Sequence, residues 1–80
     1  MNDEQIRSHI EELIAEEHQL REHGDSGKLS PDDLQRLESL EVQLDQFWDL
    51  LRQRRARRDA GQDPNVAHLR SGEVVEHYRQ

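Results

Sequence analysis

Residues 30–61 read SPDDLQRLESLEVQLDQFWDLLRQRRARRDAG, and this stretch determines how the chain folds. It opens on Ser30 and Pro31, an N-capping hydroxyl followed by a proline at the first helical position. Two aspartates come next, and their charges suit the positive end of a helix dipole. Gly61, followed by Asp63-Pro64, ends the pattern. The sequence therefore predicts one long helix over residues 31–60.

Apolar residues recur along this helix at three- and four-residue spacing. Five of them share an arc of roughly 80°: Leu37, Leu40, Leu44, Phe47 and Leu51. Leu34, Trp48 and Leu50 widen the apolar arc to about 200°. One neighbouring helix cannot cover so wide an arc, so we expect a second surface to pack against this helix.

The chain before residue 30 predicts another amphipathic helix, over residues 3–23. Asn2 or Asp3 can cap its first turn, and the glycines of Gly24-Asp25-Ser26-Gly27 favour its end. Four apolar side chains share one helical face: Ile6, Ile10, Leu13 and Leu20. The sequence thus predicts two amphipathic helices joined by about six residues.

So short a connection makes the two helices antiparallel neighbours. Centring the turn near Lys28 sets Ile10 opposite Phe47. It also brings Asp3 and Glu4 close to Arg52 and Arg54. In this register Arg55, Arg57 and Arg58 project past the first helix. The predicted fold class is all-α: an antiparallel, coiled-coil-like two-helix hairpin over residues 1–61.

Residues 62–80 form a C-terminal arm that is harder to interpret. Asp63-Pro64 and Ser71-Gly72 both interrupt helical structure. We expect a partly ordered, irregular arm with one or two helical turns, docked through Val74, Val75 and Tyr78.

Composition indicates that the hairpin requires further packing. The 80 residues are 31% hydrophobic and 36% charged, and they include no cysteine that could form a disulfide. We therefore expect a homodimer in which two hairpins pair into a four-helix bundle. Leu34, Trp48 and Leu50 are the predicted contacts with the other protomer. The alternative is that the arm folds back over this flank.

The formal net charge of −7 conceals a basic segment at the end of the second helix. Its five arginines are candidate contacts for a protein partner or for phosphate: Arg52, Arg54, Arg55, Arg57 and Arg58. Binding of nucleic acid or a ribosome through these arginines is one interpretation. The other is structural, because cations at a helix C-terminus stabilise the dipole and nearby acids neutralise them.

Glu17 is a candidate buried polar residue, because it lies inside the apolar stripe of the first helix. It either forms an ion pair with Arg21 or Arg36, or reaches solvent near the turn. A metal-binding bundle using His9, Glu12, Glu16 and Glu17 is a third functional hypothesis. The Glu-x-x-His motif of di-iron bundles does not occur, so we expect no metal and no cofactor.

The sequence contains no recognisable nucleophile motif and no phosphate-binding glycine loop. We therefore expect no enzymatic activity. No apolar run approaches the length of a membrane span, and no signal-peptide pattern follows Met1, so we expect a cytoplasmic protein without a membrane partner. The function that fits best is that of a protein-interaction or adaptor module which self-associates.

The chain resembles the domain-of-unknown-function 2630 family of small actinobacterial proteins. The resemblance rests on residues 1–6 (MNDEQI), on Glu16-Glu17-His18, and on the Trp-centred stretch that includes residues 48–56 (WDLLRQRRA). It continues through Asp63-Pro64 and residues 73–76 (EVVE) to Tyr78. The resemblance implies no particular activity, substrate or cofactor. It does imply that Glu17, Trp48, the arginines and the Tyr78 tail belong to a recurrent pattern.

Overall fold

The computed structural model describes residues 1–25 and 29–78, and the side chains of residues 1–22 and 29–75. The expected turn around Lys28 and the expected docking of the Tyr78 side chain lie outside these residues. All regular elements of the described chain are helical, which confirms the all-α class. They are listed in chain order: α1 (Asp3–Asp25), α2 (Pro31–Asp59), the 3-10 turn η1 (Pro64–Val66) and α3 (Gly72–Tyr78).

Both long helices begin with the predicted caps. Asn2 and Gln5 cap α1 reciprocally: the Asn2 side chain accepts from the Gln5 N–H at 2.8 Å, and the Gln5 side chain accepts from the Asn2 N–H at 2.9 Å. The Ser30 hydroxyl accepts from the Asp33 N–H at 3.1 Å. α1 runs two residues further than predicted, because a glycine near a helix end costs only about 1 kcal/mol.

The end of α2 is a Schellman motif, one residue earlier than predicted. Gly61 has a φ of 72°, a left-handed conformation that favours glycine. Its N–H donates to the carbonyl of Arg58 at 3.0 Å, and the Gln62 N–H donates to the carbonyl of Arg57 at 2.7 Å. This reversal sends the chain back along α2.

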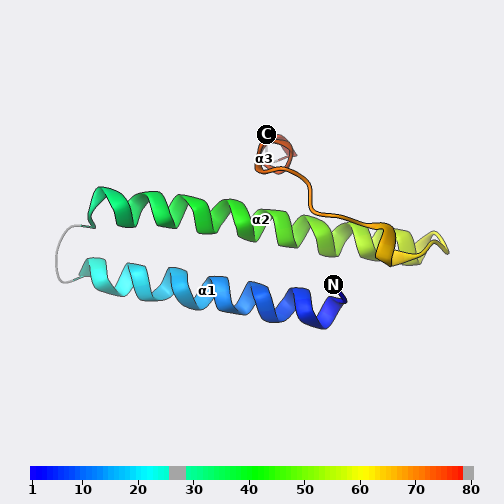
Figure 1. Ribbon diagram of the computed structural model, residues 1–80, viewed down its shortest axis with the longest axis horizontal. Coiled ribbons are helices and arrows are strands. Elements are labelled where there is room, and N and C mark those ends of the chain that lie inside the picture. Colours follow the sequence, from blue (N-terminus) through cyan, green and yellow to red (C-terminus); the bar gives the residue numbers. More distant parts are fainter. Residues whose placement is uncertain (26–28, 79–80) are drawn as a thin grey trace.

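α2 is the central element of the molecule. α1 lies beside it and runs in the opposite direction, and α3 lies on the side of α2 away from α1 (Figure 1). Both η1 and α3 contact α2. The end of α2 extends past the N-terminus of α1, and the molecule measures 51 × 26 × 15 Å. α2 therefore contacts α1 along one side and the C-terminal arm along another.

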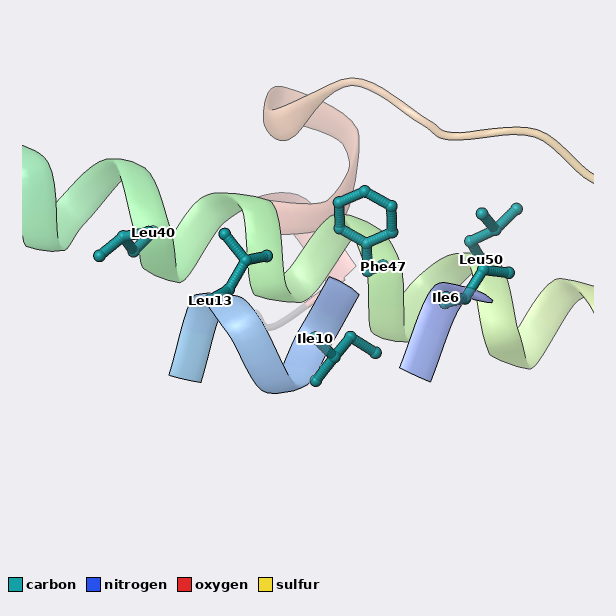
Figure 2. Close-up of a cluster of buried hydrophobic side chains, with 6 residues drawn as sticks. All are labelled: Ile6, Ile10, Leu13, Leu40, Phe47 and Leu50. Carbon is teal, nitrogen blue, oxygen red and sulfur yellow. The ribbon is translucent and has the colours of Figure 1, made fainter. Parts of the chain in front are cut away.

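The core lies between α1 and α2 (Figure 2). Its buried cluster comprises Ile6, Ile10, Leu13, Leu40, Phe47 and Leu50, with Leu20, Leu44, Leu51 and Ala67 packed around it. The prediction that Leu50 contacts another protomer is wrong. Leu50 is only 5% exposed and belongs to this cluster, against which Ala67 of the returning arm also packs.

Polar contacts fix the arm at successive turns of α2. The Gln46 side-chain amide donates to the carbonyl of Arg70 at 3.1 Å, and that of Gln53 donates to the carbonyl of His68 at 2.8 Å. Asp49, only 4% exposed, accepts from Gln53 at 2.8 Å and lies 3.6 Å from the Arg70 guanidinium. The arm thus satisfies buried polar groups of α2.

The last part of the arm approaches α2 very closely. A Cβ atom on Gly72 would lie 2.7 Å from Cγ1 of Val42, so only glycine fits at the start of α3. Val75 is buried at 3% exposure, which confirms its predicted docking. The same prediction for Val74 is wrong: Val74 is 42% exposed, because one residue of helical rotation turns it away from α2.

Candidate functional site

The five arginines at the end of α2 have different surroundings. Arg54 points into the protein and is 6% exposed. Its Nε donates to Asp3 at 2.5 Å, and its Nη1 donates to the carbonyl of Pro64 and to the Asn65 side chain, both at 3.2 Å. The prediction that Arg54 contacts a partner or phosphate is therefore wrong. Its guanidinium instead joins α1, α2 and η1.

Asp3, in the first turn of α1, binds two of these arginines. Besides Arg54, it accepts from Arg58, whose Nη2 lies 2.8 Å from Oδ2 of Asp3. Hydrogen bonds from Arg58 and Arg54 lower the pKa of Asp3 from 3.8 to about 2. The expected approach of Asp3 to Arg54 is confirmed. The expectation that Arg58 projects past α1 is wrong, because Asp3 holds its guanidinium.

The remaining arginines of the segment lie at the surface. Arg57 donates to the Gln62 side chain at 3.4 Å, on the side of α2 that faces the arm. Within the described residues, Arg52 and Arg55 make no ion pair or side-chain hydrogen bond. Both side chains are exposed, so an external anion or carboxylate can reach them.

Arg52 and Arg55 line a hollow with Trp48 at the junction of α1 and α2. Its volume is about 270 Å³, and it is lined by Asp3, Arg7, Trp48, Leu51, Arg52, Arg55 and Arg58. A larger groove of about 630 Å³ lies between α2 and the arm, lined by Asp45, Trp48, Asp49, Arg52, Gln53, Ala56, Arg70 and Val75. Trp48 and Arg52 belong to both, so they form the ridge between the two hollows.

Trp48 marks a side of the molecule that neither α1 nor the arm covers. The exposed fractions are 46% for Trp48, 51% for Leu34 and 46% for Ile14. Residues that are seven positions apart in a helix lie on nearly the same side of that helix. We call this surface the Trp48 face and define it by Arg7, Ile14 and Arg21 of α1 and Leu34, Glu41, Trp48, Arg52 and Arg55 of α2.

The α1 and α2 parts of this face adjoin each other at two places. Arg7 lines the smaller hollow together with Trp48, and Nη2 of Arg21 lies 3.5 Å from Oε1 of Glu41. Ile14 lies midway between Arg7 and Arg21 along α1, so it occupies the same side. Arg7 and Ile14 were not among the predicted site residues, although their seven-residue spacing with Arg21 is a usable signal.

Glu17 combines its two predicted environments. Its side chain is 23% exposed, and its Oε1 lies 3.6 Å from Nε of Arg21, one of the two partners expected. The neighbouring Glu16 accepts from Arg36, which lowers the pKa of Glu16 and raises that of Arg36. Glu17 is thus an ion-paired residue at the edge of the core.

The residues of the metal hypothesis do not converge. The His9 ring packs on Phe47 at a centroid distance of 4.5 Å, and its Nδ1 is 3.9 Å from Oε2 of Glu12. Glu16 and Glu17 bind arginines instead. Among the side chains that the structure describes, no three potential metal ligands lie together. No helix in the described chain is both long and apolar enough to cross a membrane.

These features define a small helical protein with two long antiparallel helices, a docked C-terminal arm and an uncovered, arginine-bordered tryptophan. The chain belongs to the family described as "Protein of unknown function (DUF2630)", whose model matches residues 2–80.

The comparison with curated proteins agrees with this family. The chain is similar to an uncharacterized protein of Mycobacterium bovis and to uncharacterized proteins from two strains of Mycobacterium tuberculosis. Each is 46% identical over 77 residues, which cover 95% of this chain and 88% of the relative. No solved structure matches the chain.

Proposed function

We propose that this protein is a non-enzymatic interaction module that self-associates through the Trp48 face. The observation that carries the proposal is the 46% exposure of Trp48 in the middle of α2. Tryptophan is a large side chain that is highly buried on average, and it is enriched among the residues that contribute most to protein interfaces. Packing against a second chain would remove Trp48 from water.

The small core supports the same proposal. The hydrophobic side chains buried within one chain, among those described, are Ile6, Ile10, Leu13, Leu37, Leu40, Phe47, Leu50 and Val75. A core of this size supplies limited stability to a chain of 80 residues. Two coiled-coil-like hairpins joined through their Trp48 faces would form a four-helix bundle with isologous contacts.

The chain carries its own probe for this test, because Trp48 is its single tryptophan. Sedimentation equilibrium is measured over a range of concentrations, and tryptophan emission is recorded at the same concentrations. We expect a concentration-dependent dimer, with Trp48 emission shifting to shorter wavelength as the dimer forms. A monomer with full helicity at every concentration would overturn the proposal.

A matched pair of variants locates the surface. Trp48→Ala removes the exposed tryptophan from the face, whereas Leu69→Ala removes an equally exposed apolar side chain from the arm, at 45% exposure. We expect Trp48→Ala to weaken dimerisation at least tenfold and Leu69→Ala to leave it unchanged. Equal effects of the two variants would contradict a specific role for the Trp48 face.

One observation favours a second function, the binding of a phosphate-bearing partner such as nucleic acid or a ribosome. Arg7, Arg52 and Arg55 surround the hollow beside Trp48, and arginine guanidinium groups bind phosphate through paired hydrogen bonds. Filter binding of the intact protein to RNA and DNA tests this function. Binding that weakens steeply as salt increases would support it, and no binding at low salt would exclude it.

A further inference from the structure

Charge along the α2 part of the Trp48 face changes sign at Trp48. Glu41 lies seven residues before Trp48, and Arg55 lies seven residues after it. Seven residues are about two helical turns, so both side chains lie on nearly the same side of α2 as Trp48. Further out, Glu38 and Arg58 lie ten residues before and after Trp48, towards opposite edges of the face. The α2 part of the face is thus acidic before Trp48 and basic after it, and Arg21 of α1 lies beside Glu41.

We propose that the partner on this face is a second copy of the chain, docked antiparallel along α2 with the two-fold axis at Trp48. This inference rests on the self-association proposed above and specifies its geometry. A two-fold axis perpendicular to α2 at Trp48 relates the two copies. A residue that follows Trp48 by a given number of positions in one chain then lies opposite the residue that precedes Trp48 by the same number in the other chain. Arg55 of each chain then meets Glu41 of the other, and the two tryptophans meet at the centre.

The same charges disfavour the parallel arrangement. A parallel pair of α2 helices would set Arg55 against Arg55 and Glu41 against Glu41, and like charges in contact are repulsive. The antiparallel arrangement replaces these contacts with two symmetric Glu41–Arg55 pairs. Charge complementarity therefore selects one orientation and one register.

The ion pairs within one chain are compatible with these contacts. Within the described residues, Arg55 and Glu38 have no ionic partner. Glu41 uses Oε1 to contact Arg21 at 3.5 Å, and both side chains remain at least half exposed, so Oε2 can accept from a second chain. Arg58 is already bound to Asp3, which makes the outer contact with Glu38 weaker than the Glu41–Arg55 pair.

Charge reversal provides a direct test of the register. Arg55→Glu creates two repulsive contacts with Glu41 in a homodimer, and Glu41→Arg creates two with Arg55. We expect each variant alone to dimerise at least tenfold more weakly than the original chain. Mixed in equal amounts, the two variants regain opposite charges at both contacts, so we expect a heterodimer near the original affinity. The chain carrying both reversals should also dimerise.

Control variants separate the register from net charge and folding. Glu12→Arg makes the same charge change as Glu41→Arg, but at an exposed site of α1 outside the Trp48 face. Arg57→Glu makes the same charge change as Arg55→Glu, but on the side of α2 that faces the arm. We expect both controls to dimerise like the original chain, with equal helicity by circular dichroism throughout.

A distance measurement provides an independent test. The chain has no cysteine, so Leu34→Cys introduces a single site for a spin label. Leu34 lies 14 residues before Trp48, so labels in an antiparallel dimer are separated by roughly 40 Å along the helix, and labels in a parallel dimer by roughly 10 Å.

The outcomes distinguish this inference from the proposed function. A dimer that Trp48→Ala disrupts, but whose charge variants do not recover on mixing, would overturn the antiparallel register and leave self-association standing. A short distance between Leu34→Cys labels would also overturn it. A chain that stays monomeric would overturn the proposed function itself.

Discussion

Arg54 and Arg55 are adjacent in sequence, but they lie on different sides of α2 and in opposite surroundings. Arg54 is buried, and its guanidinium donates to Asp3, Pro64 and Asn65. Arg55 is at the surface and makes no ion pair with any side chain the structure describes. The difference is set by the rest of the chain: Asp3 of α1 and the residues of η1 reach Arg54, whereas no described side chain pairs with Arg55.

The same contrast extends along the whole of α2. On the side facing the arm, Gln46 and Gln53 donate to backbone carbonyls, and Asp49 is buried beside Arg70. On the Trp48 face, Trp48 and Leu34 remain about half exposed. Facing the arm, α2 thus has polar side chains with partners inside the chain, whereas on the Trp48 face two large apolar side chains stay half exposed among charged ones. Exposed large apolar side chains bordered by charge are what a surface awaiting a partner would show.

Arg54→Ala tests the covered side and has the largest expected effect. Arg54→Ala removes a buried side chain and three hydrogen bonds, one of them to a carboxylate, so we expect a loss of about 3 kcal/mol in the free energy of unfolding. Chemical denaturation followed by circular dichroism measures it. Arg54→Met keeps the apolar stem and separates packing from hydrogen bonding. A loss no larger than that of Arg55→Ala would contradict the contrast between the two arginines.

Gly72→Ala tests how closely the arm must approach α2. An added Cβ would lie 2.7 Å from Cγ1 of Val42, so we expect the arm to shift and its docking to weaken by about 1–2 kcal/mol. Amide hydrogen exchange in α3 measures the loss of protection. Alanine is a better helix former than glycine. If the added Cβ did not clash with Val42, protection of the α3 amides would therefore increase. The double variant Val42→Ala/Gly72→Ala removes the opposing methyl group and should restore protection.

Asp3→Asn tests the ion pairs at the junction of α1 and α2. The pKa of Asp3 is lowered from 3.8 to about 2, so its contribution to stability is complete above pH 4 and lost as the pH falls to 2. We expect Asp3→Asn to cost about 1 kcal/mol at pH 6, a modest value because solvent screens the partly exposed pair. Denaturation of both chains from pH 6 to pH 2 measures the difference. A difference that stays constant over this range would show that Asp3 does not act through its charge.

The sequence predicted the elements whose signals are local. Ser30 and Pro31 mark the start of α2, and the apolar spacing of both long helices follows directly from the period of an α-helix. Placing Asp3 near Arg54 required only the register of two antiparallel helices. The contact between them confirms that register.

The errors arose where partners come from distant, aperiodic parts of the chain. Leu50 was assigned to a second protomer because nothing periodic predicts that Ala67 of the arm will pack against the cluster that contains Leu50. Arg54 was grouped with the other arginines because its acceptors in η1 depend on a chain reversal at Gly61. The groove between α2 and the arm was missed for the same reason. Hydrogen bonds from side-chain amides to backbone carbonyls follow no regular spacing in the sequence, so no pattern predicts them.

Arg55→Ala has the smallest expected effect on the folded chain and completes the comparison. Because Arg55 has no partner within the described chain, we expect its loss to change the unfolding free energy of the monomer by less than about 0.5 kcal/mol. Denaturation at concentrations too low for dimerisation measures this value, and sedimentation of the same variant measures association. Unchanged monomer stability with weakened association would place the role of Arg55 between chains. Weakened stability of the monomer would instead place a partner for Arg55 within its own chain, and the distinction between the two sides of α2 would no longer hold.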